Sequence, residues 1–253
     1  MSESNKSGRE HQTDFGFKTV DEDKKADEVR QVFDSVAPKY DLMNDVLSLG
    51  THRLWKRRCI AEANVGQGMK LLDIASGTGD LAIAFAKRAG AGNVTATDIN
   101  REMLTIGSKR LRAAGVPSSC VVADAEALPF ATDSFDVVTV SFGIRNMTHK
   151  DRALSEMLRV LRPGGRLLVL EFSRCQGWIK PVYDFYSFRF MPWLGAKIAG
   201  DADSYRYLAE SIRMHPAQGP FAKMMEKAGF VDVTWHNLTF GICALHIGTK
   251  PDL

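Results

Sequence analysis

The chain has 253 residues and a formal net charge of +3, with 45% hydrophobic and 25% charged residues. This fits one large globular domain with a substantial core, and the small charge gives no reason to expect binding to nucleic acid. The four cysteines are scattered, with no CxxC and no histidine at ligand spacing, so zinc and a disulfide framework are not expected, as suits a reducing cytoplasm. No apolar run reaches the roughly 18–20 residues that would span a bilayer.

The N-terminal part is expected to be a tail followed by helices. Residues 1–23 are polar, contain no hydrophobic segment typical of a secretory signal, and are expected to form a flexible tail. From 24 to about 40 the apolar residues recur at spacings of three and four, which predicts an amphipathic helix. A second helix is expected over 51–63. Its basic residues are Arg53, Lys56, Arg57 and Arg58, which form either a solvated face or a contact with anionic lipid.

Short strands then alternate with helices. Strands are expected at 70–75, 93–98, 119–123, 135–141 and 166–171, and helices at 80–88, 101–113 and 150–161. This alternation predicts a parallel sheet wound by right-handed crossovers. After a helix at 218–228, strands at 230–236 and 241–248 are joined by a short link, which permits only an antiparallel pair. The predicted fold class is therefore α/β, with a parallel sheet that finishes in an antiparallel hairpin.

The segment 175–216 interrupts this alternation and holds a high share of the aromatic residues. We interpret it as a helical insertion in a single domain that spans 24–253. Its apolar face is either part of the core or a lid over a hydrophobic substrate.

Several candidate site residues fall where the predicted strands end, and ligands of a wound sheet bind there. Gly77 and Gly79 form a turn in which the backbone can approach a ligand closely, because glycine has no Cβ. Asp98 ends the second strand, where a carboxylate can accept hydrogen bonds from both hydroxyls of a ribose. Asp124–Ala125 follows the third strand on the expected adenine side, and Ser141 ends the fourth strand.

The glycine turn by itself leaves two cofactors open. Its hexapeptide GTGDLA satisfies the relaxed dinucleotide fingerprint, so an NAD-dependent oxidoreductase on a Rossmann sheet is the alternative. Asp73 lies upstream within the strand and gives a D-x-A-x-G-x-G pattern that resembles motif I of class I methyltransferases, although Ala75 stands where that motif usually has glycine. The segment DAEALPF at 124–130 and the terminal hairpin also resemble that class. These features favour S-adenosylmethionine.

Longer signatures resemble one family, the UbiE-type methyltransferases. The residues YDLMN at 40–44, with Leu47, Ser48, His52 and Trp55, resemble its Y-D-x-M-N-x-x-L-S-x-x-x-H-x-x-W signature. The segment RVLRPGG at 159–165, continuing to EFS at 171–173, resembles its second signature, with Arg162 where lysine is more usual. The segments FGIRN at 142–146 and DADSYRYLAESIRMHP at 201–216 resemble the family as well. The resemblance extends from about Phe15 to Gly248.

This resemblance implies a Rossmann-like class I methyltransferase fold. It implies C-methylation of the aromatic ring of a polyprenylated quinol, in ubiquinone biosynthesis, menaquinone biosynthesis or both. It also implies that S-adenosylmethionine is bound by Thr78, Asp98, Asp124, Ala125 and Ser141. From the turn itself we add Asp73, Gly77 and Gly79 to the cofactor site, and we expect no metal.

The chemistry requires an activated ring carbon. The quinol must be reduced, and one hydroxyl must lose its proton to a base that lies close by or one water away. We predict that Arg145 and Asn146 orient the quinol oxygen or a bridging water and stabilise the phenolate, because a guanidinium stays protonated and is a poor base. Tyr40 is the third predicted member. The structural alternative is that Arg145 pairs with a helix carboxylate and Asn146 caps the helix near Thr148.

Other polar residues are weaker candidates for the site. His52 and His215 are expected to be structural more often than catalytic. A further group either shapes the acceptor pocket or holds the insertion onto the domain, and its members are Asp201, Asp203, Tyr205, Tyr207 and Arg213. Expected partners are the quinol and the inner face of a membrane, with a homodimer or a biosynthetic complex left open. If the chain is not an enzyme, the alternative is a catalytically silent scaffold in such a complex.

Overall fold

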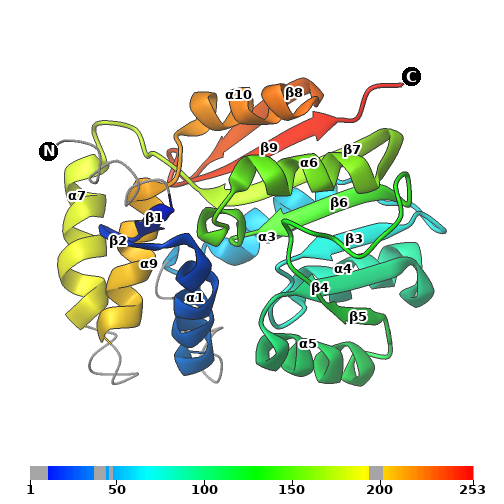
Figure 1. Cartoon of the computed structure of the whole chain (residues 1–253), viewed down its shortest axis with the longest axis horizontal. Coiled ribbons are helices and arrows are strands. Elements are labelled where there is room, and N and C mark those ends of the chain that lie inside the picture. The colour runs from blue at the N-terminus through cyan, green and yellow to red at the C-terminus, as the bar shows by residue number, and fades with distance from the viewer. Residues whose placement is uncertain (1–10, 37–43, 46–47, 194–201, 253) are drawn as a thin grey trace, which may run out of the picture.

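The computed structural model describes residues 11–36, 44–45, 48–193 and 202–252, and a seven-stranded sheet lies at its centre (Figure 1). The strands are β3 (Leu71–Ile74), β4 (Val94–Asp98), β5 (Ser119–Val122), β6 (Phe135–Ser141), β7 (Leu161–Phe172), β8 (Val231–Leu238) and β9 (Cys243–Thr249). Their order is β5-β4-β3-β6-β7-β9-β8. The first five pair in parallel, and β9 pairs antiparallel with both β7 and β8. The predicted parallel sheet with a terminal antiparallel hairpin is confirmed.

This strand order positions the site. The chain builds β3, β4 and β5 outward in one direction and then returns to place β6 on the other side of β3. In a wound sheet, such a reversal opens a crevice at the carboxyl ends of the strands on either side of it. The predicted cofactor residues follow β3, β4, β5 and β6, so the topology alone brings them to one edge.

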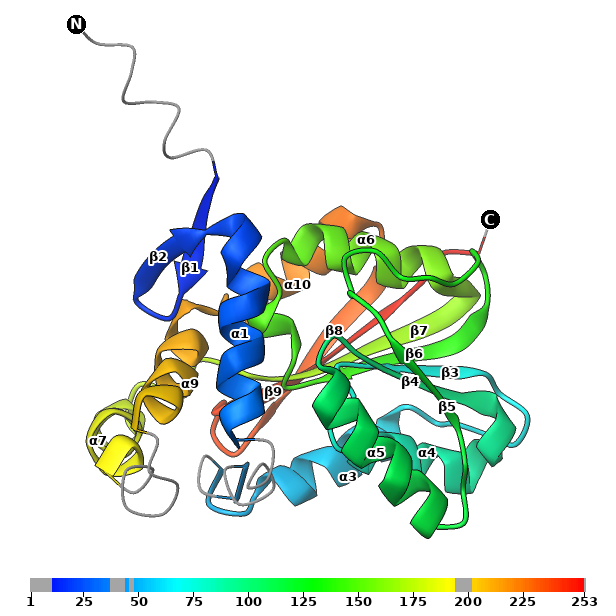
Figure 2. The same ribbon diagram turned by 60° about the horizontal axis from the view of Figure 1, so that its bottom comes forward.

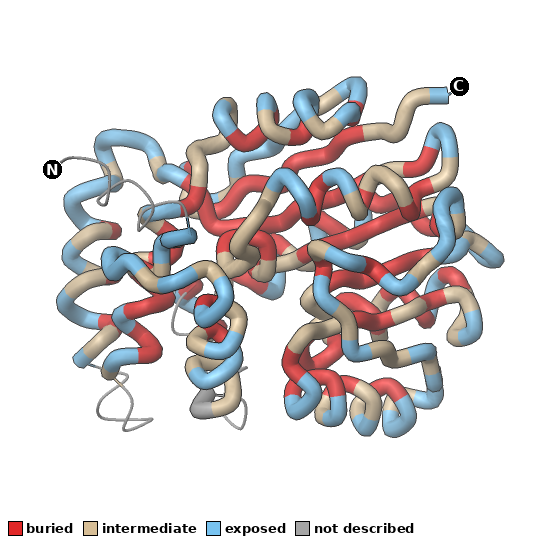
Figure 3. The backbone as a smooth tube through the Cα atoms, viewed as in Figure 1, coloured by how far each residue is buried: buried red, intermediate tan, exposed pale blue. Residues whose placement is uncertain are grey.

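Helices cover both faces of the sheet. They are α3 (His52–Glu62), α4 (Asp80–Ala89) and α5 (Arg101–Ala113) on one face, and α6 (Lys150–Val160) and α10 (Gln218–Ala228) on the other. Alternate residues of a strand serve opposite faces. Leu71 packs with the first set of helices and Leu72 with the second, because the strands are buried on both sides. Figure 3 shows the buried residues concentrated along these strands.

Two further segments form a separate group beside the sheet. A hairpin of β1 (Gln12–Phe15) and β2 (Lys18–Asp21) leads into α1 (Glu22–Val36). The inserted segment forms α7 (Lys180–Phe185), the π-helix η4 (Tyr186–Phe190) and α9 (Ala202–Met214). Figure 2 shows the hairpin, α1, α9 and α7 standing together at one side of the sheet. No helix of the described residues is long and apolar enough to cross a membrane.

The predicted flexible tail at 1–23 is wrong for residues 12–23. These residues form the hairpin and the start of α1. The hairpin is held by α9, because the Phe15 ring stacks on the Tyr207 ring with centroids 4.2 Å apart and the Phe17 amide donates to the Glu210 carboxylate at 3.0 Å. Strands of four residues that are half exposed carry little hydrophobic pattern, so periodicity could not predict them.

A close contact joins the ends of β3 and β6. Ala75 follows β3 with a φ of 50°, in the left-handed region that costs a residue with a Cβ about 1–2 kcal/mol. Gly143 follows β6 with an ordinary φ of −114°, and a Cβ built there would overlap the Cβ of Ala75. Gly143 is therefore required by the methyl group opposite it and not by its own backbone.

We expect Gly143→Ala to lower the free energy of unfolding by about 1–3 kcal/mol, because two methyl groups would occupy one place. Ala75→Gly should raise it by up to about 1 kcal/mol by relieving the left-handed strain. The double variant should recover most of the loss, as measured by urea unfolding of all four proteins. A double variant as unstable as Gly143→Ala would show that the clash is not between these two residues.

Candidate functional site

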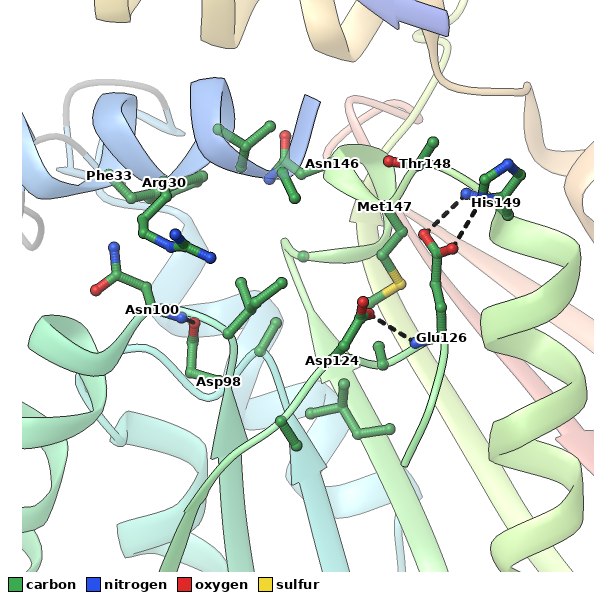
Figure 4. A pocket seen from close by; sticks show the side chains of 18 of the residues that line it. Arg30, Phe33, Asp98, Asn100, Asp124, Glu126, Asn146, Met147, Thr148 and His149 are labelled. Carbon is green, nitrogen blue, oxygen red and sulfur yellow. Dashed lines mark hydrogen bonds and ion pairs between the residues drawn. The ribbon is translucent and has the colours of Figure 1, made fainter. Parts of the chain in front are cut away.

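A cavity of about 320 Å³ lies at the carboxyl ends of the parallel strands (Figure 4). The loops after the strands supply its floor, through 74–75, 77, 98–100, 123–126, 142–143 and 146–149. The helix α1 covers it from the other side and contributes Ala26, Val29, Arg30 and Phe33. Because those positions recur at helical spacing, one face of α1 forms the roof.

The glycine turn brings backbone close to backbone. Gly77 and Gly79 have φ values of 55° and 84°, a region that favours glycine. Gly107 of α5 packs against the turn so closely that a Cβ there would lie 2.9 Å from the Gly77 carbonyl oxygen. Lys56 and Arg110 hold the next residue, Asp80, at 2.9 and 2.7 Å. The turn is therefore fixed from α3, α5 and its own helix α4.

Asp98 connects the turn to the neighbouring helix. Its Oδ2 accepts the Gly77 amide at 2.8 Å, and its Oδ1 accepts the Asn100 amide at 2.8 Å. Burial raises the pKa of this carboxyl to about 6, against the opposing backbone hydrogen bonds of Asn100, Gly77 and Ile99. A carboxylate offers about four lone-pair positions. A position that the amides leave open can accept a hydroxyl of a ribose in the cavity.

Asn100 extends this network to the roof. Its Oδ1 accepts the Met103 amide at 2.9 Å and caps α5, while its Nδ2 donates to Asp34 of α1 at 2.6 Å. Asn100 was not among the predicted site residues, although an asparagine just before a predicted helix is a preferred cap and could have indicated it.

The other predicted cofactor residues divide into two groups. Gly77, Asp98 and Asp124–Ala125 line the cavity, and Asp124 is held by the Glu126 amide at 2.9 Å. Asp73, Thr78, Gly79 and Ser141 do not belong to the lining. Their roles toward the cofactor stay predictions.

Buried polar atoms at the strand ends support a polar ligand. The hydroxyl of Ser141 has no hydrogen-bond partner within the described part of the chain. Asp73 accepts the Thr139 hydroxyl at 2.7 Å, and burial raises its pKa to about 6 against the opposing hydrogen bonds of Thr139 and Ser76. A buried polar group without a partner is costly. The Ser141 hydroxyl at the end of β6 is therefore suited to a polar ligand.

The predicted catalytic residues do not all reach the cavity. Arg145 does not line it: its Nη1 donates to Glu171 of β7 at 2.8 Å and to the Phe142 carbonyl at 2.5 Å, and its side chain is 3% exposed. Its carboxylate partner therefore lies on a strand and not on a helix, and the role of Arg145 toward the quinol stays a prediction. Tyr40 lies outside the described residues.

Asn146 does line the cavity, within the short helix η3 (Ile144–Asn146). Its Oδ1 accepts the hydroxyl of Tyr207, from α9, at 3.0 Å. The helix α6 that follows has His149 at its cap position, so Asn146 is not the cap that the structural alternative assumed. The inserted segment thus reaches the cavity wall through Tyr207.

A cluster of two glutamates and one histidine at the rim of the cavity was not among the predicted site residues. His149 Nδ1 lies 2.8 Å from Glu126, and its Nε2 lies 3.3 Å from Glu22 at the start of α1. All three residues line the cavity, as Figure 4 shows for His149 and Glu126. They come from three separate segments, and no spacing along the chain could indicate their meeting.

The remaining candidates have structural surroundings. His52 is buried against the Ser48 hydroxyl at 2.9 Å, and burial lowers its pKa. His215 is buried beside Phe221. In the basic group of α3, Arg53 pairs with Asp45 and Arg58 with Glu62, so those charges are engaged within the chain.

Comparisons with known proteins agree with this architecture. A model of the ubiE/COQ5 methyltransferase family matches residues 18–250. The ubiquinone/menaquinone biosynthesis C-methyltransferase UbiE of Paraburkholderia phymatum is 60% identical over 240 residues, which cover 94% of this chain and 99% of that protein.

Two solved structures share the fold. A methyltransferase in complex with the Haloferax volcanii activator Trm112 has a TM-score of 0.63 at 20% identity, over 87% of this chain and 97% of that one. Phosphoethanolamine N-methyltransferase 2 of Haemonchus contortus, in complex with S-adenosylmethionine, has a TM-score of 0.60 at 17% identity, over 78% of this chain and 52% of that one. At such identities the likeness concerns the fold alone.

We expect the affinity for S-adenosylhomocysteine to depend on the ionisation of Asp98. Because its pKa is raised from 3.8 to about 6, the carboxylate that accepts ribose hydroxyls forms only as the pH rises through 6. Calorimetric titration should show affinity falling about tenfold per pH unit below 6 and constant above it. Because the folded state binds this proton more tightly than the unfolded state, the free energy of unfolding falls as the pH rises from 3.8 to 6. Binding should therefore be compared at pH values at which the protein is fully folded.

Asp98→Asn should bind weakly at every pH and lose this dependence. Asp151→Asn, at an exposed carboxylate on α6, is the control and should behave as the wild type. A pH dependence that survives in Asp98→Asn would assign it to another group.

Proposed function

The chain belongs to the ubiE/COQ5 methyltransferase family, and on that premise we propose that it methylates a ring carbon of a reduced, polyprenylated quinol. Its cofactor is S-adenosylmethionine, so the alternative of an NAD-dependent oxidoreductase is not supported. The observation that carries the proposal is one cavity in which Asp98 and Asn146 both form part of the wall. The Asp98 carboxylate is suited to accept the hydroxyls of a ribose, and the Asn146 amide is suited to donate to a quinol oxygen that becomes anionic.

The cofactor side follows from the strand ends. Asp98 would accept the ribose hydroxyls, Asp124–Ala125 would bound the adenine, and the unpartnered hydroxyl of Ser141 would bind the amino acid end of the cofactor. When bound there, S-adenosylmethionine supplies an electrophilic methyl group on sulfur. The chain contributes by holding the reacting groups in line, which can account for much of the acceleration.

The acceptor side centres on the Asn146 amide. Because its Oδ1 already accepts the Tyr207 hydroxyl, its Nδ2 is left to donate toward the cavity. A donor fixed in this way stabilises a phenolate more than a neutral hydroxyl. The phenolate electrons would move to the ring carbon, which would bond to the methyl carbon as its bond to sulfur breaks and S-adenosylhomocysteine leaves. The ring proton would then pass to water, which restores the aromatic ring. Tyr40 stays a prediction as a further member of this side.

Arg145 supports the Asn146 amide without lining the cavity itself. It bonds the Phe142 carbonyl and Glu171, and the Glu171 carboxylate also accepts the Arg145 amide at 3.3 Å. The ion pair thus holds both ends of the turn that carries Asn146. We assign Arg145 a positioning role.

An exposed apolar patch suits an acceptor that lives in a lipid bilayer. We define it as Trp178, Val182, Phe185 and Phe240. The first three are 66%, 68% and 69% exposed, and Trp178 packs on Phe240 at 5.0 Å. Exposed aromatic residues gathered in this way are uncommon on a monomer surface. With the exposed Arg189 beside them on the inserted segment, they fit peripheral contact with an anionic membrane, and we propose that the inserted segment is the lid over the prenyl chain.

Turnover should be measured with S-adenosylmethionine and a reduced short-chain prenylated quinol, with the product identified by mass spectrometry. Asn146→Ala should lower kcat by about 100-fold, because one donor to the phenolate is lost, and should leave cofactor affinity unchanged. Tyr207→Phe should lower it by about tenfold, since the amide is no longer oriented. The oxidised quinone is the control and should not react. Binding of NADH with no methylated quinol would contradict the proposal.

The patch should drive binding to vesicles of anionic phospholipid. We expect the combined variant Trp178→Ser and Phe185→Ser to lower co-sedimentation at least tenfold, because two aromatic side chains no longer insert. Turnover of a water-soluble acceptor should not change. Trp235→Ser, which removes an exposed tryptophan from β8, is the control and should bind vesicles as the wild type does. Equal loss in both proteins would show that the contact is not specific to this patch.

A further inference from the structure

Two lysines, Lys25 buried and Lys150 partly buried, lie next in the chain to residues that line the cofactor cavity. Lys25 of α1 is only 4% exposed, and its Nζ donates to the Thr13 hydroxyl at 3.4 Å. Lys150, the first residue of α6, donates from Nζ to the Met147 carbonyl at 3.1 Å. Neither forms an ion pair with a carboxylate within the ranges that the structure describes. Burying an ammonium group without a carboxylate partner costs free energy, so a compensating anion is expected nearby.

The carboxylates nearest to these amines are already engaged. Glu171 is paired with Arg145 at 2.8 Å, and His149 lies 2.8 Å from Glu126 and 3.3 Å from Glu22. Asp14 of β1 is exposed, so water screens its charge. His215, which follows α9, adds no negative charge. Neither amine therefore has a carboxylate of its own within the described residues.

The pKa of Lys150 shows the effect of these surroundings. Burial, and next the charge of Lys25, lower the pKa of Lys150 to about 8, although Glu171, Asp14 and Glu126 act in the opposite direction. Burial also lowers the pKa of Lys25. Lys150 further stands at the amino end of a helix, where the macrodipole disfavours a cation. An anion that entered next to these groups would be stabilised by all of these effects together.

The cavity is the place where such an anion can enter. Residues on both sides of Lys150 line it, namely Met147, Thr148, His149 and Arg152, and so do Asp23 and Ala26 beside Lys25. The Lys150 amine bonds the carbonyl of Met147, the residue that follows Asn146. The Lys150 amine thus lies next to the residue that follows Asn146, whose amide we assign to the quinol oxygen, and the charge of Lys25 acts on Lys150.

We propose that Lys25 and Lys150 form an electropositive cluster that stabilises the phenolate form of the quinol bound in the cavity. The inference rests on the proposed function, because it takes the quinol as the acceptor. Both lysines are positioning residues: they act through space on the hydroxyl, whose proton leaves to water. The carboxylate of S-adenosylmethionine is another anion that could use the same field, and the experiment separates the two.

The test uses the full chain and a chromophoric probe, a short-chain prenylated hydroquinone that carries a nitro group and absorbs near 400 nm as the phenolate. Its pKa when bound is read by titration in the presence of S-adenosylhomocysteine. In the wild type this pKa should lie below that of the free probe. In Lys150→Met it should rise by about one to two units, and in Lys25→Met by a smaller amount. Lys150→Arg, which keeps the charge, should retain most of the effect.

Activity and stability provide the second readout. Lys150→Met should lower turnover at pH 7 by about 10–100-fold and recover toward pH 9, where the quinol ionises without help. Its free energy of unfolding should equal or exceed that of the wild type, because a buried charge is removed. Lys24→Met is the matched control, since Lys24 is the exposed neighbour of Lys25 and is paired with Asp21 at 2.8 Å.

The outcomes are distinct. A bound pKa of the probe that is the same in the wild type and in Lys150→Met would overturn the inference while the quinol methyltransferase activity stands. Weakened binding of S-adenosylmethionine in Lys150→Met, with the probe unchanged, would assign the cluster to the cofactor carboxylate and also overturn it. A wild type that neither binds the probe nor methylates a quinol would instead contradict the proposed function.

Discussion

The carboxylate of Asp98 is the group on which the arrangement of the site depends. It accepts the amide of Gly77 after β3 and the amide of Asn100 before α5, so one side chain fixes two loops from neighbouring strands. Asn100 then bonds Asp34 and extends the same network to α1 above the cavity. Burial opposes the charge of Asp98, and the two amides offset part of that cost. The ligand that completes its hydrogen bonding therefore also stabilises the ionised form.

A second buried charge organises the acceptor side. Arg145 and Glu171 are both almost fully buried, and together they bond the Phe142 carbonyl and the Arg145 amide. Buried ion pairs contribute little net stability, because desolvation cancels much of the attraction. Their value here is geometric, since they fix the turn that presents Asn146. The cost of this arrangement is consistent with a role in function more than in stability.

The cavity is complete only when distant parts of the chain are assembled. The strands provide its floor, α1 provides its roof, and α9 reaches its wall through Tyr207. The hairpin packs on α9 through Phe15 and Tyr207, so the N-terminal residues and the inserted segment support one another. An acceptor that is large and apolar requires such a cover, because the parallel sheet alone leaves its carboxyl edge open to water.

The sequence by itself determined the sheet and the place of the cofactor. Hydrophobic periodicity marks the buried strands, and the residues that end them must gather at one edge once the strands are parallel. The glycine turn, Asp98 and Asp124 could be found in this way, and the signatures indicated the family. Local signals of this kind reach only a few residues along the chain.

Only the tertiary structure decided how the side chains are used. Arg145 turned from the cavity to Glu171, and the rim cluster of Glu22, Glu126 and His149 came together from three segments. Lys25 and Lys150 lie in helices far apart in the sequence, yet the fold buries Lys25 and brings the charges of the two amines close enough to interact. Burial, ion pairing and the electrostatic field depend on residues far apart in the chain. That is the physical reason why composition and spacing could locate the site but could not assign the roles within it.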